Sequence, residues 1–307
     1  MAQITAALVK ELRDKTSAGM MDCKKALTEV DGNIEAAIDW LRKKGIAKAT
    51  KKSGRIASEG LVAFCTKGNI GALVEVNSET DFVARNDEFQ GAVREIATLA
   101  VDANGDIAAL AGATTQAGVS VSNYLTALIA KLGENMSLRR TSSVNVKEGV
   151  VAAYIHGAIS EGLGGIGVLV GLESSGDKDA LNVLGKKIAM HIAATSPLAL
   201  SVDDLDPAVV ERERTVLSDQ ARASGKPENI IEKMVEGRIR KFYQESVLLN
   251  QTFVMDGERS VAKVIEDEAK SLGTDIKMTS FVRMGLGEGI EKKEEDFAAE
   301  VAAMSGS

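Results

Sequence analysis

The chain has 307 residues, of which 45% are hydrophobic and 4% aromatic, and its formal net charge is -7. This length provides for two or more aliphatic cores, and the acidic balance offers no basic field that would neutralise many phosphates. Direct nucleic-acid binding is therefore disfavoured. No apolar run approaches the roughly 18 residues of a membrane span, and no apolar leader is found at the start. We expect a cytoplasmic protein with no membrane partner.

Residues 1–55 are predicted to form a separate module of three helices. Apolar residues at helical spacing indicate the first helix, and two further helices are expected at 21–30 and 33–45. Asp31-Gly32 provides the turn between these two. The basic run at 42–55 is interpreted as a solvated linker, because no aromatic residue interleaves with its charges.

Two adjacent methionines, Met20 and Met21, lie at the first turn of this module. Both side chains do not fit comfortably into one small core. Exposed methionine forms a soft binding surface, and core filling by at least one of the pair is an equally good reading.

An internal repeat organises the middle of the chain. EGLVAF at 59–64 returns as EGVVAA at 148–153, and GALVEVNS at 71–78 returns as GVLVGLES at 167–174. These strand patterns predict a hairpin in each copy. Two helices and a third strand follow, expected at 88–100, 124–133 and 136–140 in the first copy and at 180–194, 261–273 and 280–284 in the second. The fold class is therefore α+β, with related ββααβ subdomains at 56–145 and 146–285.

The second copy carries an insertion at about 203–249, between its two helices. All three prolines lie nearby, and Gly225-Lys226-Pro227 separates two helical segments. We expect an antiparallel helical hairpin with a coiled-coil seam in its second arm, formed by Ile231, Val235, Phe242 and Leu249. A last helix is expected at 290–304, in a C-terminal helical module at 286–307.

Enzyme motifs are poorly supported. GLGGIG at 162–167 has dinucleotide-fingerprint spacing, but a strand pattern follows it where the fingerprint requires a helix. We interpret 157–166 as a long, flexible hairpin turn. His191 is expected to be a core or interface histidine, and neither it nor His156 has a neighbour at metal-ligand spacing. The sequence indicates no enzyme, no catalytic residues, no metal site and no cofactor.

The two copies diverge between the hairpin and the first helix. The first copy has TDFVA at 80–84, whereas the second has SSGDKDA at 174–180. Phe82 and Val83 are apolar where a loop is normally polar. Because folding explains what both copies share, function is best sought in this unshared loop.

Four segments carry a resemblance to a known family: ITAALVKELRDKTSAGMMDCKKAL near the start, TDFVA, KMVEGRIRKF in the hairpin, and GEGIEKKEEDFAAEVAAM at the end. Over essentially its whole length the chain resembles the elongation factor Ts family, the bacterial guanine-nucleotide exchange factors of translation. Two departures are Thr252, where the family usually has proline, and the longer turn at 157–166. The resemblance implies a UBA-like N-terminal module and a hairpin that can form a homodimer through its coiled coil.

The resemblance also implies a partner, elongation factor Tu, and promotion of GDP release and GTP loading. Asp81 and Phe82 fall on the family's intruding acid and aromatic residue, within the Thr80 to Val83 segment associated with displacing the partner's magnesium ion.

Further partner contacts are implied at positions remote from this loop. Arg13, Met20 and Met21 fall on the family's contact residues in the N-terminal module, and His156 on a core position near the contact surface. The terminal helix also touches the partner in the family. The alternative is a passive coiled-coil interaction scaffold without exchange activity.

Overall fold

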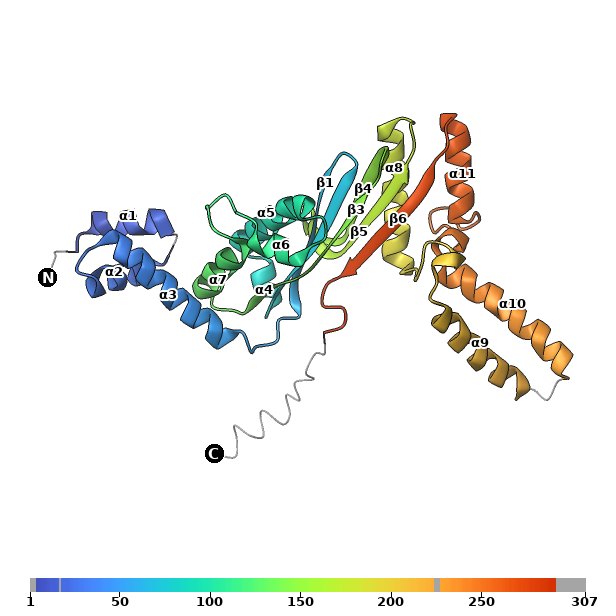
Figure 1. Ribbon diagram of the computed structural model, residues 1–307, viewed down its shortest axis with the longest axis horizontal. Helices are drawn as coiled ribbons and strands as arrows, with labels where there is room; N and C mark the ends of the chain where they lie inside the picture. Colours follow the sequence, from blue (N-terminus) through green and yellow to red (C-terminus); the bar gives the residue numbers. More distant parts are fainter. Residues whose placement is uncertain (1–3, 17, 224–226, 291–307) are drawn as a thin grey trace.

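The computed structural model describes residues 4–16, 18–223 and 227–290 and has mixed helix and sheet, which confirms the predicted α+β class (Figure 1). The N-terminal helices are α1 (Ala6–Thr16), α2 (Met20–Glu29) and α3 (Ile34–Lys52). The first repeat contains β1 (Glu59–Lys67), β2 (Ile70–Ser78), α4 (Asp81–Ala84), α5 (Asp87–Ala103), α6 (Ile107–Gly112), α7 (Val121–Leu132) and β3 (Met136–Asn145).

The second repeat has the predicted ββααβ order without counterparts of α4 and α6, and it is interrupted by the predicted hairpin. Its own elements are β4 (Gly149–Ser160), β5 (Leu163–Glu173), α8 (Lys178–Thr195), α11 (Val261–Leu272) and β6 (Lys277–Gly285). Between α8 and α11 lie the short 3-10 helix η1 (Val202–Asp204), then α9 (Pro207–Arg222), α10 (Glu228–Ser246) and η2 (Leu248–Asn250). The helix expected at 290–304 lies outside the described residues.

The six strands found in the described residues belong to one antiparallel sheet. Its main order is β3-β2-β1-β5-β4, and β6 pairs with β5. The two repeats meet where β1 pairs with the start of β5, at Val62↔Gly164 and Ala63↔Leu163. This strand pairing is short, so the two repeats must also be held together by packing between their side chains.

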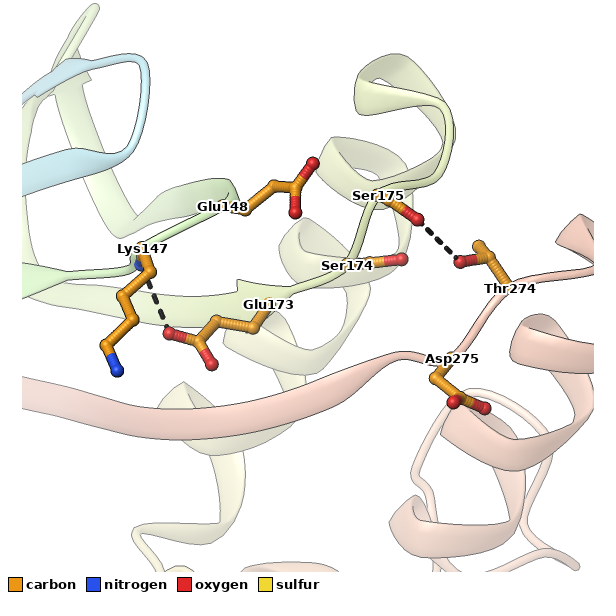
Figure 2. Close-up of a pocket in the computed structure, with 7 residues that line it drawn as sticks. All are labelled: Lys147, Glu148, Glu173, Ser174, Ser175, Thr274 and Asp275. Carbon is orange, nitrogen blue, oxygen red and sulfur yellow. Dashed lines mark hydrogen bonds between the residues drawn. The ribbon is translucent and has the colours of Figure 1, made fainter.

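A polar pocket opens at the end of the second repeat where β4 begins and β5 ends (Figure 2). The Ser175 and Thr274 hydroxyls lie 3.0 Å apart, and the Lys147 N–H donates to Glu173 at 3.1 Å. The lining residues are Lys147, Glu148, Glu173, Ser174, Ser175, Thr274 and Asp275.

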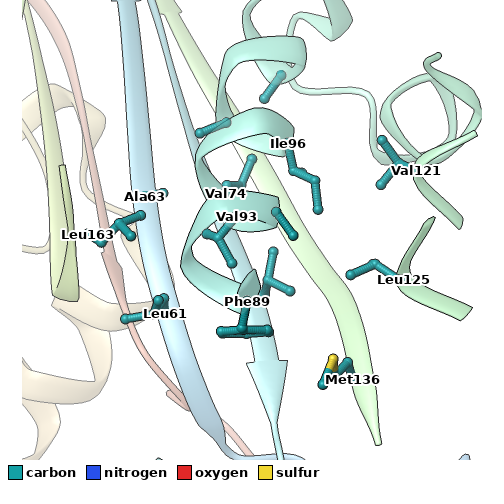
Figure 3. Close-up of a cluster of buried hydrophobic side chains, with 14 of the residues drawn as sticks. Leu61, Ala63, Val74, Phe89, Val93, Ile96, Val121, Leu125, Met136 and Leu163 are labelled. Atoms are coloured by element: carbon teal, nitrogen blue, oxygen red, sulfur yellow. The ribbon is translucent and has the colours of Figure 1, made fainter. Parts of the chain in front are cut away.

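Helices cover the outer faces of the strands, and the inner faces of the two repeats pack on one another. Strand residues alternate accordingly: Leu61 and Ala63 face the helices of the first repeat, whereas Val62 joins a central cluster with strand residues of the second. Figure 3 shows the first core, in which Phe89 and Ile96 of α5 lie over the strands. In Figure 1, α5 to α7 and α8 with α11 flank opposite sides of the sheet. Both faces of the strands are therefore apolar, because one face packs on helices and the other on the opposite repeat.

Glycines allow the two inner faces to approach closely, and they do so reciprocally. A Cβ on Gly71 of β2 would lie 2.7 Å from Val151 Cγ1, and one on Gly167 of β5 would lie 2.5 Å from Leu73 Cδ2. Gly71 and Gly167 are equivalent positions of the sequence repeat. The duplication is therefore visible in packing as well as in sequence.

The basic run at 42–55, predicted as a linker, is helical through Lys52. α3 continues across it and packs against α7, where a Cβ on Gly45 would lie 3.6 Å from Ala130 Cβ. Ala49 reaches the edge of the first core. Lys, Arg and Ala are good helix formers, and packing on α7 offsets the roughly 1 kcal/mol cost of a helical glycine. The linker prediction is therefore wrong.

The two arms of the helical hairpin pack on one another as an antiparallel pair. Its small core consists of Leu217 and Ala221 from α9 with Ile231, Val235 and Ile239 from α10. The predicted seam is correct at Ile231 and Val235. It is wrong at Phe242, which packs at the base of the hairpin, and at Leu249, which packs at the edge of the second core because α10 ends at Ser246. Val247 and Leu248 are fully buried at the base, so the projecting arms end before them.

A buried carboxylate ties the segment after β6 to the first repeat. Glu75 of β2 is 0% exposed and accepts from Arg139 Nη1 at 2.8 Å and Arg140 Nε at 2.5 Å. The Gly287 N–H also donates to it, at 2.8 Å. Burial alone raises the pKa of Glu75, but hydrogen bonds from Gly287 and the two arginines outweigh burial and hold the pKa below its usual value. The end of the second repeat is thereby fixed against the first.

Candidate functional site

The connection from β2 to α5, predicted as a loop, contains the one-turn helix α4. Thr80 is its N-cap residue, and Glu134 accepts from the Thr80 N–H at 3.0 Å and from its hydroxyl at 2.7 Å. The Ser78 hydroxyl donates to the Thr80 carbonyl at 2.9 Å. Thr80 is thus bonded through its amide, its carbonyl and its side chain. Its part in the site is to fix the start of α4.

Neighbouring side chains of α4 point in different directions. Phe82 is 80% exposed, whereas Val83 is 8% and Ala84 2% exposed, and both of these belong to the first core. Successive residues of a helix point about 100° apart, which separates Phe82 from Val83. The sequence grouped the two as apolar loop residues, and the structure corrects this, because Val83 packs inward. Leaving this phenyl ring exposed gives up about 1.5–3 kcal/mol of stabilising free energy that its burial would contribute.

Asp81 is exposed beside Phe82. Its carboxylate lies 3.4 Å from Arg85 Nη2, one helical turn away, and both side chains are more than half exposed. Such an exposed pair contributes little to stability. The Asp81 carboxylate therefore remains open to an approaching partner.

The predicted long turn at 157–166 is wrong. β4 and β5 remain paired to their ends, so the turn is only Glu161-Gly162, with Gly162 at φ +74. The glycines after it belong to β5. Gly164 packs closely on the opposing strand, because a Cβ at this position would lie 2.4 Å from Ile155 Cγ2. Close approach within the sheet explains GLGGIG, and neither a flexible turn nor a nucleotide loop is needed.

His156 lies on β4, and its side chain is exposed. The Tyr154 hydroxyl lies 3.3 Å from His156 Nδ1. Further along the strand, Ile159 is also exposed, and the Ser160 hydroxyl contacts α5. The end of the hairpin therefore presents His156 and Ile159 from a strand that is fastened to the first repeat.

The residues expected in the N-terminal module are all exposed. Met20 is 60% and Met21 74% exposed, and Arg13 is exposed on α1. The core of the module is formed without them, around Leu12 and Leu27. Core filling by one of the methionines is thus excluded. Figure 1 places α1 and α2 at the far end of α3 from the sheet, so these residues are not brought together with α4.

His191 is a satisfied core histidine, as predicted. It is 0% exposed, its Nδ1 accepts from the Val254 N–H at 3.2 Å, and its Nε2 lies 2.9 Å from Gln251 Oε1. An accepting Nδ1 places the proton on Nε2, which donates to Gln251. Burial lowers the pKa of His191, opposed by the hydrogen bond to Gln251. The ring is neutral and structural.

The other described parts of the molecule give weaker evidence of a functional site. Within residues 4–16, 18–223 and 227–290, no group of three His, Cys, Asp or Glu side chains has the arrangement of a metal site. In the same described part, no helix is both long and apolar enough to cross a membrane. The polar pocket of Figure 2 lies at the opposite end of the β4–β5 hairpin from Ser160.

Sequence reasoning missed the residues that hold the site in place. Glu134 lies 54 positions from Thr80, and Glu75 lies 65 positions from Arg140. No local periodicity connects such pairs. Only the register between β2 and β3 brings them together.

Known proteins match the chain along its length. A family model described as elongation factor TS matches residues 79–288. Elongation factor Ts of Maricaulis maris is 61% identical over 310 residues, which cover 100% of this chain and 99% of that protein. Elongation factor Ts of Rhizobium etli and that of Rhodospirillum rubrum are each 60% identical, with 99% of both chains covered. The chain, with its paired repeats, helical hairpin and exposed Phe82, belongs to the elongation factor Ts family.

Proposed function

We propose that this protein is a guanine-nucleotide exchange factor that binds elongation factor Tu carrying GDP and promotes GDP release and GTP loading. Membership of the elongation factor Ts family supports the activity and the partner. The main observation in support of this site is that Phe82 is 80% exposed on a helix whose other side packs into the core. A large apolar side chain held outward by a braced helix has the form of a wedge.

Asp81 and Phe82 disturb the partner's magnesium and phosphate site in this proposal. Magnesium requires near-ideal octahedral geometry, so a small displacement of its ligands weakens the binding of a nucleotide held through it. The phenyl ring of Phe82 enters an apolar slot of the partner, and the Asp81 carboxylate acts beside it. Thr80 and Val83 contribute by holding α4, through Glu134 and the first core respectively.

Exchange follows from differential binding. A factor that loosens GDP by some ratio is itself loosened by GDP in the same ratio, because coupling between two ligands is reciprocal. Each tenfold of coupling corresponds to about 1.4 kcal/mol. The protein therefore has to make its best contacts with the nucleotide-free partner.

The other parts of the chain make further contacts in this proposal. Residues 1–55 anchor the partner through Arg13, Met20 and Met21, and the two repeats hold the wedge, with His156 as a further contact. A further contact with the partner is proposed for residues 286–307, of which 291–307 lie outside the described residues. The helical hairpin pairs with a second copy of this chain, which is supported by Val209, Val216 and Ile230 remaining exposed on its arms.

Release of labelled GDP from purified elongation factor Tu tests the exchange activity. We expect the full chain to accelerate release strongly and in proportion to its concentration until it saturates the partner. Binding to elongation factor Tu without any change in the release rate would contradict the proposal and favour the passive scaffold. An unrelated acidic protein at the same concentration is the control.

Removal of the hairpin arms tests self-association separately. A Gly-Ser linker joining Glu211 to Lys241 keeps the base, where Val210, Phe242 and Val247 pack together. We expect sedimentation to detect self-association in the full chain and its loss in the shortened one, with GDP release largely preserved. Unchanged sedimentation would contradict pairing through the hairpin.

A further inference from the structure

One amide side chain connects α4 to the second repeat. Gln90 is in the first turn of α5 and is 8% exposed. Its Nε2 donates to the Ala84 carbonyl, the last residue of α4, at 3.3 Å. Its Oε1 accepts from the Ser160 hydroxyl, at the end of β4, at 2.9 Å. The same side chain therefore contacts the helix that carries Phe82 and the hairpin that carries His156.

The directions of these hydrogen bonds are fixed by a neighbouring cation. Arg94, one turn along α5, donates from Nη2 to the Ser160 hydroxyl oxygen at 2.7 Å and to Gln90 Oε1 at 3.5 Å. Arginine has no acceptor, so Ser160 accepts from Arg94 and has its own proton left for Gln90. The amide oxygen of Gln90 is then committed to Ser160, and its NH2 group faces Ala84. Each of the three side chains sets the orientation of the next.

This arrangement lies between two exposed surfaces. Phe82 is two residues before Ala84, and the exposed Ile159 immediately precedes Ser160. A wedge is effective only when the element that carries it is held in place, since misplacement by about 1 Å can cost a hundredfold in rate. A mutually oriented set of hydrogen bonds, centred on the buried Gln90 side chain, supplies such rigidity.

We propose that Gln90 and Ser160 are positioning residues that couple α4 to the β4–β5 hairpin, so that Phe82 and the hairpin end meet one protein partner as a single rigid surface. This inference rests on the proposed exchange function. Neither residue touches nucleotide. Their effect reaches the partner through the orientation of α4.

Ser160→Ala removes the hydroxyl with little change in volume, and Ser160→Thr restores it. The matched control is Ser143→Ala, because Ser143 on β3 also bonds to the end of α5, donating to Asn104 at 3.0 Å, but at the opposite end of that helix from α4. Loss of one intramolecular hydrogen bond corresponds to about a fivefold change.

GDP release from elongation factor Tu is measured over a range of concentrations of each variant. We expect Ser160→Ala to lower the maximal release rate about fivefold, with a smaller change in the half-saturating concentration. Ser160→Thr restores the rate, and Ser143→Ala leaves it unchanged. Hydrogen exchange of the Arg85 and Asn86 amides, which close α4, rises in Ser160→Ala but not in Ser160→Thr or Ser143→Ala.

An unchanged maximal rate in Ser160→Ala would overturn the proposal. So would a lowered rate with unchanged exchange of the Arg85 and Asn86 amides, because Ser160 would then act by direct contact with the partner. Gln90→Leu is the second variant, and it has to raise the exchange of the same amides. If the unmodified chain does not accelerate GDP release, the exchange function fails, while amide exchange still decides whether Ser160 holds α4.

Discussion

The two repeats differ most in how β2 and β5 lead into the helices that follow. In the first repeat the chain forms α4 and exposes Phe82 before α5 begins. In the second, a closed turn leads directly into α8, with the Gly176 N–H donating to Ser174 Oγ at 3.1 Å. A Cβ on Gly176 would lie 2.7 Å from Thr274 Cγ2, so Gly176 itself has no space for a side chain, and the exposed residues beside it, Ser175 and Asp177, are polar. The same scaffold therefore carries an exposed aromatic residue in one copy and a short polar turn in the other.

A second difference lies inside the sheet. Pairing shifts after Glu75 between β2 and β3, and after Gly171 between β5 and β6, which are equivalent positions of the repeat. Glu75 holds Arg139 and Arg140 there. A Cβ on Gly171 would instead lie 2.9 Å from Val144 Cγ1, in the central cluster. The equivalent bulges therefore contain a buried carboxylate at Glu75 in one copy and a tightly packed glycine at Gly171 in the other.

Phe82→Ala should have the largest effect on function. We expect the maximal GDP-release rate to fall by about a hundredfold to a thousandfold, or about 2.7–4 kcal/mol, with unfolding unchanged because Phe82 is 80% exposed. Val183→Ala, at an exposed apolar position of α8 in the second repeat, is the control and should have no effect. A Phe82→Ala variant that unfolds readily but exchanges normally per folded molecule would place Phe82 in the core.

Glu75→Gln should cost about 3 kcal/mol of unfolding free energy, since it leaves two arginines without their buried charge partner. The pKa of Glu75 is lower in the folded chain than its ordinary 4.5, so its stabilisation is present above that value and is lost as pH falls through the folded pKa. Urea unfolding at several pH values should therefore show a weaker acid dependence in the variant. The exposed Glu266→Gln in α11 is the control, and an equal loss in both would refute the argument.

Val83→Ala should cost about 1–2 kcal/mol of stability, because it opens space in the first core. Its maximal GDP-release rate should fall far less than that of Phe82→Ala, the adjacent residue. Thermal unfolding and GDP release at saturating concentration separate the two effects. The reverse pattern, a stable Val83→Ala with little exchange, would mean that Val83 meets the partner.

A chain that begins at Arg42 should bind elongation factor Tu about tenfold more weakly, or by about 1.4 kcal/mol. It lacks Arg13, Met20 and Met21 but keeps the half of α3 that packs on α7. Anchoring shared by both nucleotide states affects affinity more than the displacement step, so the maximal release rate should be preserved. A maximal rate that falls as sharply as the affinity would give the module a direct part in displacement.

The smallest effect should come from His191. Its folded pKa lies below the ordinary 6.5, so its stabilisation is present above that value and is lost as pH falls toward the folded pKa. We expect the unfolding free energy to fall as the pH is lowered below the ordinary pKa of histidine. This dependence should vanish in His191→Gln and persist in the exposed His156→Gln. A dependence that persists in His191→Gln would assign it to another group.

Local pattern by itself determined most of the helices and strands of this protein, but it missed α4 and α6. The period of apolar residues predicted α5 and α8, and the duplicated strand motifs predicted β1, β2, β4 and β5, each with at least one end within a few residues of the observed end. The glycine and proline at 225–227 predicted the break between α9 and α10. Such patterns succeed because a helix or strand is defined by neighbours along the chain. The exposed Phe82 was also found this way, as an apolar residue in a polar segment that the second repeat lacks.

Only the tertiary structure decided what surrounds these elements. The sequence pattern is equally apolar at Phe82 and Val83, and only the packing of α4 on the sheet turns one outward and the other inward. The glycines near Gly164 look like a turn until the opposing strand is in place. Glu75 finds its arginines through strand register, across 64 and 65 positions. Contacts between distant segments are set by how whole elements pack, and no local period encodes them.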